Sequence, residues 1–246
     1  MDDPKRIFSI TQRGIDFMRR ANAEDRPFYL QLSHYAVHVD MQTTPESLAD
    51  SKVRPEGKHH NIPAFAGMTQ DLDAGIGRIL DELDALGIAD NTYVFYMADN
   101  GAVPWIPPDK RKHLTNPREL DDTSRNHPLR AGKWTLFEGG IRVPFIVRGP
   151  GIDANSFCDI PVVGWDLLPT IAALASYDSP FPEDLDGIDM RPLLFDKDAS
   201  GIRKQPLIFH RYAGGYDHSA IREGDYKLIQ FWRQPDNGEL HPPLAP

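Results

Sequence analysis

The chain has one cysteine among its 246 residues. A single thiol cannot close an internal disulfide, so the chain is not a small domain held together by a disulfide framework, and its cysteine usage does not indicate a redox compartment. Cys158 stands in the sequence Cys-Asp-Ile-Pro-Val. We interpret it as a small buried hydrophobic residue.

Long apolar runs and an excess of basic residues are also missing. No run approaches the ~18 apolar residues of a transmembrane helix, so no membrane span is predicted. Met1 is followed by Asp-Asp-Pro-Lys-Arg, which predicts no secretory signal in this chain. With 36 acidic and 27 basic residues the net charge is −9, which argues against a general nucleic-acid-binding protein. A local basic cluster at residues 110–113 is interpreted as a solvated loop.

Hydrophobic periodicity predicts alternating helices and strands in the first 178 residues. Helices are expected at residues 7–22, 68–86 and 165–175, with Gly87 ending the second, and strands at residues 28–32, 93–97 and 144–148. Residues 39–66 and 104–127 are expected to be irregular loops. Helices that alternate with buried strands predict an α/β fold with a mostly parallel sheet flanked by helices.

The composition changes after Asp178, where the sequence becomes rich in proline and turn-forming residues. A strand is expected at residues 205–210, and two short strands within residues 219–231 around Glu223-Gly224-Asp225. We therefore divide the chain into an α/β core at 1–178 and a C-terminal subdomain with a small antiparallel sheet and a tail at 179–246. The last six residues are expected to be disordered or cut short.

Asp99 and Asn100 directly follow the apolar strand at residues 93–97. Ligand sites in α/β sheets lie beyond the carboxyl ends of the strands, and adjacent carboxylate and amide oxygens are hard ligands suited to Ca²⁺ or Mg²⁺. Asp-Asn-Gly is also a common turn signal, so the tripeptide by itself supports two interpretations.

A segment rich in glycine and charge follows at residues 129–144, with the sequence LRAGKWTLFEGGIRVP. Small residues flank Lys133, so the backbone can approach a ligand while the ammonium group offers a compact charge to an oxyanion. The alternative is a surface lysine in a glycine-rich turn.

This segment closely resembles the signature P-L-R-G-G-K-x-T-x-x-E-G-G-x-R-x-P of the sulfatase family, which is arylsulfatase-like and belongs to the alkaline-phosphatase-like superfamily. Residues 26–38, RPFYLQLSHYAVH, are similar to the strand and the A-P-H type motif of that family, with Val in place of Pro. Residues 165–170, 185–187 and 220–229 resemble its later elements. The resemblance covers residues 5 to 232 and implies an incomplete alkaline-phosphatase-like fold.

The resemblance also implies roles for individual residues. Asp99 and Asn100 would bind Ca²⁺, with Mg²⁺ as the alternative ion, and Lys133 would bind a sulfate oxygen. His38 would contact the sulfate or protonate the departing alcohol. His34 is a second candidate for the histidine, and both histidines have a structural interpretation as well. Arg130 is a candidate substrate-binding residue.

Other charged residues of these segments and of their neighbours are expected to support the site. Arg130 and Arg142 have an alternative role as partners of Glu138 or of an aspartate. Asp73 and Asp166 are interpreted as helix caps or internal hydrogen-bond partners. Asp2 and Asp3 resemble a metal-binding pair only superficially, because no apolar strand precedes them.

The sulfatase nucleophile motif, C/S-x-P-x-R, whose first residue becomes formylglycine, does not occur in this sequence. The chain is therefore interpreted as the C-terminal portion of a sulfatase, with formylglycine expected only in a missing N-terminal region and with that region as a partner. By itself the chain is expected to be inactive. This sequence does not indicate a compartment, and a periplasmic or secreted location is compatible with a longer parent protein.

Two other functions stay open on the sequence. One is a non-enzymatic fragment that binds an anion or a partner protein, and the other is a phosphoester hydrolase of the same superfamily. The expected substrate is a sulfated small molecule or glycan, and the irregular loops carry no pattern that identifies it.

Overall fold

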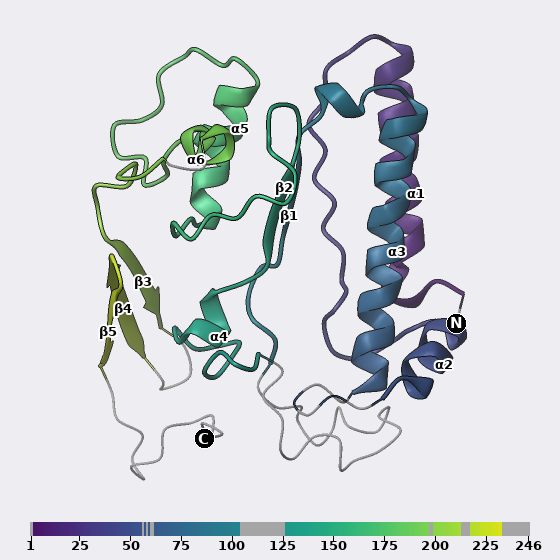
Figure 1. Cartoon of the computed structure of the whole chain (residues 1–246), viewed down its shortest axis with the longest axis horizontal. Helices are drawn as coiled ribbons and strands as arrows, with labels where there is room; N and C mark the ends of the chain where they lie inside the picture. The colour runs from purple at the N-terminus through teal and green to yellow at the C-terminus, as the bar shows by residue number, and fades with distance from the viewer. Residues whose placement is uncertain are drawn as a thin grey trace.

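The computed structural model describes residues 2–55, 57, 59, 62–103, 126–196, 199–212 and 217–232. The expected tail at residues 241–246 lies outside these residues. So does the expected polar stretch at residues 104–127 with its basic cluster at 110–113, except for residues 126 and 127. The architecture of the described part is shown in Figure 1.

Two long helices run side by side and in the same direction on one flank of the molecule (Figure 1). Helix α1 spans Ile7–Ala23 after a short 3-10 turn, η1, at Pro4–Arg6, and helix α3 spans Pro63–Ala85. Both helices were expected, and α3 begins five residues earlier than the predicted residue 68. Ile15 and Met18 of α1 and Leu83 of α3 form a buried cluster between them. Gly87 ends the second helix with a positive φ of 69°, as predicted.

Residues 28–32 were predicted to form a strand, and that prediction is wrong for the described part of the chain, since no ladder pairs with them there. The segment is nevertheless extended, and its burial alternates. Phe28 and Leu30 pack on the helix cluster, and Leu32 approaches α1 where Gly14 leaves room, while Tyr29 is exposed. The alternation therefore orients one face of the segment toward the helices without making it a sheet strand.

The first pair of strands is antiparallel. β1 spans Val94–Met97 and β2 spans Phe145–Arg148, with Val94 opposite Arg148 and Met97 opposite Phe145. The expected mostly parallel sheet is thus not formed among the described strands, because the glycine-rich segment between β1 and β2 turns the chain back alongside β1. β1 is also less buried than predicted, since Met97 is exposed. The extended segment and β1 do run in the same direction (Figure 1).

Helix α2, at Pro45–Val53, lies within residues 39–66, which were predicted to be a loop. The prediction failed because the helix has almost no hydrophobic periodicity, and its start depends on capping instead. The Thr44 hydroxyl accepts a hydrogen bond from the backbone N–H of Ser47 at 3.2 Å, and Pro45 occupies the first turn.

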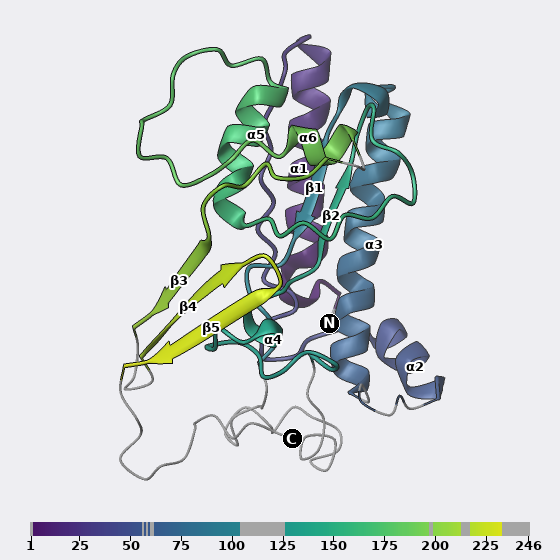
Figure 2. The ribbon, with the colours of Figure 1, turned by 60° about the vertical axis from the view of Figure 1, so that its left-hand side comes forward.

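The C-terminal region contains short helices and a three-stranded sheet, shown from a second side in Figure 2. Five short helical elements lie between α3 and this sheet in the sequence: η2 (Ala89–Asn91), α4 (Glu138–Ile141), η5 (Gly164–Asp166), α5 (Leu167–Leu174) and α6 (Arg191–Phe195). The strands β3 (Leu207–Arg211), β4 (His218–Glu223) and β5 (Tyr226–Phe231) pair antiparallel in that order. The predicted small antiparallel sheet is therefore confirmed.

One prediction from the composition is wrong. Cys158 is exposed, so its interpretation as a buried residue is wrong. It lies in the irregular connection between β2 and α5, where no core packs around it. No helix in the described ranges is long and apolar enough to cross a bilayer.

Candidate functional site

The residues after β1 are hydrogen-bonded to the glycine segment, by which we mean residues 131–140. The Gly101 N–H donates to the Gly140 carbonyl at 2.9 Å, and the Lys133 N–H donates to the Ala102 carbonyl at 3.0 Å. Two segments separated by about thirty residues in the sequence therefore lie against each other through their backbones. This arrangement places Asp99 and Asn100 beside the loop that carries Lys133.

Asn126 connects the same two segments. Its side-chain oxygen accepts from the Ala102 N–H at 2.9 Å, and its side-chain nitrogen donates to the carbonyls of Ala102 and Ala131, each at 2.9 Å. Sequence reasoning missed this residue, because an asparagine before His-Pro reads as an ordinary turn residue. Its role depends on the long-range approach of the two segments.

The glycines of this region are required by the close approach of backbones. A Cβ atom on Gly101 would lie 1.7 Å from the Gly139 carbonyl oxygen, and one on Gly140 would lie 2.1 Å from the Thr135 carbonyl oxygen. No side chain fits at either position. The Gly-Gly pair after Glu138 thus allows the glycine segment to fold tightly on itself, and Gly101 allows the end of β1 to approach Gly139.

Asp99 and Asn100 have the chemistry of a partial site for a hard cation. Asp99 is exposed, and its carboxylate forms no ion pair within the described residues. The Asn100 side-chain nitrogen donates to the Gly101 carbonyl at 3.2 Å, which leaves the amide oxygen as the atom available to a metal. Among the described residues no group of three or more His, Cys, Asp or Glu side chains gathers around them. Since Ca²⁺ takes about six to eight oxygens, two side chains would give only part of its shell.

Lys133 is half-buried and is fixed through its backbone rather than through its side chain. Its N–H is held by Ala102, whereas its ammonium group forms no ion pair or hydrogen bond with any described residue. A cation that is fixed in place and lacks a carboxylate partner is suited to an anionic ligand.

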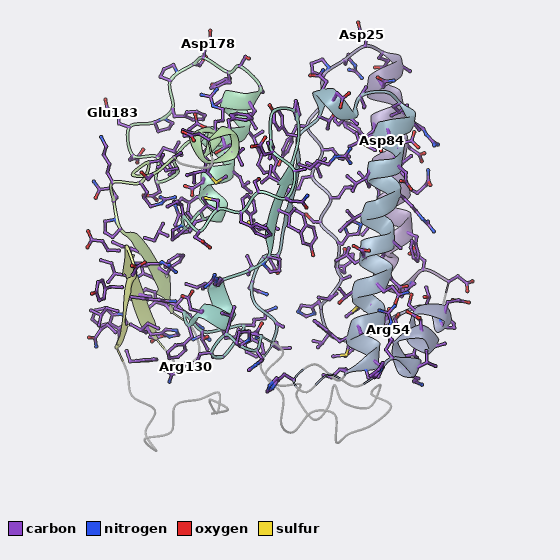
Figure 3. The ribbon with its side chains drawn as sticks, in the orientation of Figure 1. Asp25, Arg54, Asp84, Arg130, Asp178 and Glu183 are labelled. Carbon is purple, nitrogen blue, oxygen red and sulfur yellow. The ribbon has the colours of Figure 1, made fainter. Side chains whose placement is uncertain are left out.

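Arg130 does not pair with Glu138, which was one of its expected roles. Its guanidinium lies over the ring of Phe137 at 4.1 Å from the centroid, and its carbonyl accepts the Gly139 N–H at 2.8 Å. The side chain is exposed near the lower end of the molecule in Figure 3, where α4 faces the C-terminal sheet. Its charge therefore stays available for a substrate.

Glu138 is paired with the C-terminal sheet instead. Its carboxylate accepts from Lys227 Nζ at 2.7 Å and lies 3.4 Å from an Arg222 nitrogen. Burial acts to raise the pKa of Glu138, but the hydrogen bond from Lys227 and the charges of Lys227, Arg222 and Arg142 outweigh it and lower that pKa. Arg142 thus acts on Glu138 at longer range only.

The two histidines proposed for the site have different surroundings. His34 is half-buried, its Nε2 lies 3.2 Å from the Thr11 hydroxyl of α1, and its pKa is lowered mainly by burial. These contacts indicate a structural role. His38 is exposed, and its Nδ1 donates a hydrogen bond to the Val39 carbonyl at 2.5 Å. That bond does not involve the other ring nitrogen, Nε2.

Within the described residues, His38 forms no hydrogen bond or ion pair with Asp99 or Lys133. His38 lines a separate open pocket with Tyr35, Lys5 and Arg6. Figures 1 and 2 show, however, that the extended segment and β1 lead to the same end of the molecule. The segments that carry the histidine and the candidate metal-binding pair therefore lead toward the same end of the molecule, although only one of them is a sheet strand.

The supporting aspartates are only partly those predicted. Asp166 is fully buried and accepts from the N–H groups of Val163 and Ile188 at 2.9 Å each, and from Arg203, so its internal role is confirmed. Asp73 is exposed without such partners among the described residues, because its side chain lies on the outer face of α3. Asp71, two positions earlier, is the buried aspartate.

Comparison with known proteins identifies the family. Residues 9–177 match the family model described as Sulfatase, and residues 131–242 match the model described as N-sulphoglucosamine sulphohydrolase, C-terminal. The chain belongs to the sulfatase family. The resemblance inferred from the sequence motifs is thereby confirmed.

Individual relatives agree with this assignment. The chain is 35% identical over 181 residues to steryl-sulfatase of Rattus norvegicus, covering 73% of this sulfatase chain and 28% of that protein. It is 33% identical over 180 residues to arylsulfatase A of Homo sapiens, covering 73% and 31%. The chain thus spans less than a third of the length of these curated relatives.

A solved structure gives the same result for the fold. The crystal structure of Ps i-CgsB superposes with a TM-score of 0.75 at 30% sequence identity, over 91% of this chain and 45% of that chain. The incomplete α/β fold of the alkaline-phosphatase-like type with a small C-terminal antiparallel sheet is therefore confirmed as the fold class of this sulfatase chain. The roles of His38, Lys133, Arg130, Asp99 and Asn100 stay predictions.

Proposed function

We propose that this chain forms the metal-binding and sulfate-binding wall of an active site that hydrolyses sulfate monoesters. The observation that carries the proposal is the backbone pairing of residues 101 and 102 with the glycine segment, through Gly101–Gly140 and Ala102–Lys133. That pairing sets a hard-ligand pair and a cation without a carboxylate partner beside one another. Family membership then favours sulfate over phosphate as the anion.

Asp99 and Asn100 would hold a Ca²⁺ ion, or Mg²⁺ as the alternative, through the Asp99 carboxylate and the Asn100 amide oxygen. The bound ion would supply positive charge to the sulfate oxygens. Lys133 would contact a sulfate oxygen and stabilise the charge that grows there as the S–O bond breaks. Arg130, exposed on Phe137, would contact a more distant part of the substrate.

His38 would act on the leaving group. Because Nδ1 is held by the Val39 carbonyl, the other ring nitrogen is the one free to carry a proton to the departing alcohol oxygen. This assignment requires the substrate to reach from Lys133 to the pocket that contains His38, both at the same end of the molecule.

The nucleophile must come from residues outside this sequence, since C/S-x-P-x-R is absent here. We propose a formylglycine in that role, supplied by a preceding part of a longer protein. The 246-residue chain alone is therefore expected to hydrolyse 4-nitrophenyl sulfate at the background rate. Turnover by the purified chain would contradict the assignment of an external nucleophile.

The binding functions can be tested on the chain as it stands. In an NMR titration of the ¹⁵N-labelled chain, Ca²⁺ should shift the amides around residues 99–102 with a weak Kd, on the order of 10⁻³ M. Asp99→Asn should remove this response, and Asp178→Asn, which changes an exposed carboxylate in the loop after α5, should leave it intact. A Ca²⁺ response that survives Asp99→Asn would refute the metal site.

The sulfate role of Lys133 needs its own measurement. In a longer protein that carries the nucleophile, Lys133→Ala should lower kcat/KM by on the order of 10², as for the loss of one charge-stabilising donor. The matched control is Lys52→Ala, an exposed lysine on α2. Equal rates for the two variants would remove Lys133 from the site, and a higher affinity for phosphate than for sulfate would favour the phosphoester hydrolase instead.

A further inference from the structure

The turn that carries Lys133 has a strained backbone. Ala131 and Trp134, which flank Lys133, have positive φ angles of 60° and 73°, a region that is unfavourable for residues with a Cβ atom. A backbone in this region costs free energy and persists where surrounding contacts impose it. The position of Lys133 therefore depends on contacts made from outside the turn.

One set of contacts holds the N-terminal part of the turn. The Lys133 N–H donates to the Ala102 carbonyl at 3.0 Å, and the Asn126 side-chain nitrogen donates to the Ala131 carbonyl at 2.9 Å. These bonds fix the turn to the residues that follow β1. They act on residues 131 and 133, so the C-terminal end of the turn needs a restraint of its own.

His218 of β4 restrains that end. Its Nε2 accepts a hydrogen bond from the Leu136 N–H at 3.0 Å, across 82 positions of the sequence. His218 is fully buried and Leu136 is almost fully buried. Because a buried N–H without an acceptor is costly, any movement of Leu136 that breaks this bond is unfavourable. The bond therefore opposes relaxation of the strained backbone at Trp134, two positions earlier.

Other contacts keep the C-terminal sheet in place if this bond is removed. Helix α4 follows closely after Leu136 and lies beside the sheet (Figures 1 and 2). Its Glu138 accepts a hydrogen bond from Lys227 Nζ of β5 at 2.7 Å, and the His218 ring stacks on that of Phe231. Removing only the acceptor should therefore loosen the turn without detaching the sheet.

We propose that His218 is a positioning residue for Lys133. The hydrogen bond from Leu136 to His218 keeps the strained turn in the conformation that sets Lys133 beside Asp99 and Asn100. His218 does not bind the anion itself and acts through the backbone of residues 134–136. The inference rests on the proposed function for the sulfate that Lys133 binds, but not for the effect of His218 on the turn.

Amide hydrogen exchange of the ¹⁵N-labelled 246-residue chain measures the effect on the turn. His218→Phe keeps a ring that can stack on Phe231 but removes the acceptor, and it should speed exchange of the Lys133 amide about tenfold, as for the loss of one hydrogen bond. His218→Gln offers a side-chain oxygen to Leu136 and should restore the rate to within about threefold. Unchanged protection of the Lys133 amide in His218→Phe would overturn the proposal.

A titration of the same chain with sodium sulfate measures the effect on the ligand, with sodium chloride at equal ionic strength as the reference. His218→Phe should weaken sulfate binding about tenfold, and His218→Gln should weaken it less than about threefold. Equal weakening by the two variants would assign the effect to the shape of the imidazole rather than to its acceptor, and the proposal would fail.

Phe231→Leu is the control for a loss of stability alone. It removes the ring that stacks on His218 and keeps the bond from Leu136. It should lower the urea midpoint yet leave both the exchange of the Lys133 amide and the sulfate affinity within about twofold, since the hydrogen bond is retained. If it weakens sulfate binding as much as His218→Phe at an equal loss of stability, His218 has a structural role only.

Two further outcomes separate the remaining cases. His218→Leu is a second variant without an acceptor, for use if the phenyl ring does not fit; if neither variant folds while His218→Gln does, the bond supports the whole fold and a role confined to the turn is rejected. If sulfate binds Lys133→Ala as tightly as the unsubstituted chain, the proposed function fails, and the exchange measurement still decides the role of His218.

Discussion

The Nε2 atom of His218 accepts a hydrogen bond of 3.0 Å from the backbone N–H of Leu136. His218 is fully buried on β4, and its ring stacks on that of Phe231 of β5 with a centroid distance of 5.1 Å. Phe231 in turn lies near Phe137, at 6.4 Å between centroids. The C-terminal sheet is therefore fixed to the glycine segment that carries Lys133.

His218→Ala should lower the free energy of unfolding by about 2–3 kcal/mol, because the buried Leu136 N–H loses its acceptor and the ring leaves a cavity. Urea unfolding followed by circular dichroism measures the loss. The control is His210→Ala on β3, an exposed histidine bonded to the Ser219 hydroxyl at 2.7 Å, with an expected loss of about 1 kcal/mol or less. Equal losses would mean that the hydrogen bond from Leu136 to His218 does not add measurably to the free energy of unfolding.

The ion pair between Glu138 and Lys227 of β5 should make the stability of the chain sensitive to acid. The pKa of Glu138 is lowered from the ordinary 4.5 in the folded chain, so its stabilising contribution is complete above about pH 4.5 and is lost as the pH falls through the lowered value. Glu138→Gln removes this dependence. Between about pH 6 and pH 3 the urea midpoint of the variant should therefore fall less than that of the unsubstituted chain.

The control for this comparison is Glu183→Gln, which alters an exposed carboxylate in the loop labelled in Figure 3. Its midpoint should follow the unsubstituted chain at each pH. A Glu138→Gln profile that overlays both would show that the pairing with Lys227 adds no stability.

Asp71 joins α3 to the start of α2 and offers a matched pair with Asp73. Its carboxylate accepts from the hydroxyls of Thr43, Thr44 and Ser47 at 2.6–2.8 Å and from the Thr44 N–H at 2.8 Å. Asp71→Ala should destabilise the chain by about 2–3 kcal/mol because these donors lose their partner. Asp73→Ala, on the exposed face, should change the stability by ~0.5 kcal/mol or less. Thermal unfolding of both variants measures the two losses, and equal losses would contradict the role assigned to Asp71.

Gly101 is the most restrictive position of the candidate site. Gly101→Ala places a Cβ atom 1.7 Å from the Gly139 carbonyl oxygen, and the backbone shift needed should cost on the order of 3 kcal/mol and abolish the Ca²⁺ response. Gly77 in α3 is the matched control, since a Cβ there meets nothing within 4 Å. Gly77→Ala should raise the stability by about 0.5–1 kcal/mol. Wild-type Ca²⁺ binding by Gly101→Ala would contradict the described backbone contact.

Local signals were sufficient for most of the secondary structure. The 3.6-residue period of α1 and α3, the helix end at Gly87, and the turn at Gly224 between β4 and β5 follow from residues near one another in the chain. Helix α2 was not predicted because its start depends on the Thr44 cap, and it has no apolar face that a periodic pattern would reveal. The strand at residues 28–32 was wrong because alternation predicts an extended chain but not a ladder partner.

The sequence by itself determined the sulfatase family, since the motifs at residues 129–144 and 26–38 are local strings of residues with a specific order. Only the tertiary structure decided which groups meet. Asn126 links the two halves of the site, Glu138 pairs with Lys227 rather than with Arg130, and Lys5 and Arg6 share a pocket with His38. These contacts join residues far apart in the chain, and side-chain identity alone does not specify which distant groups will neutralise one another.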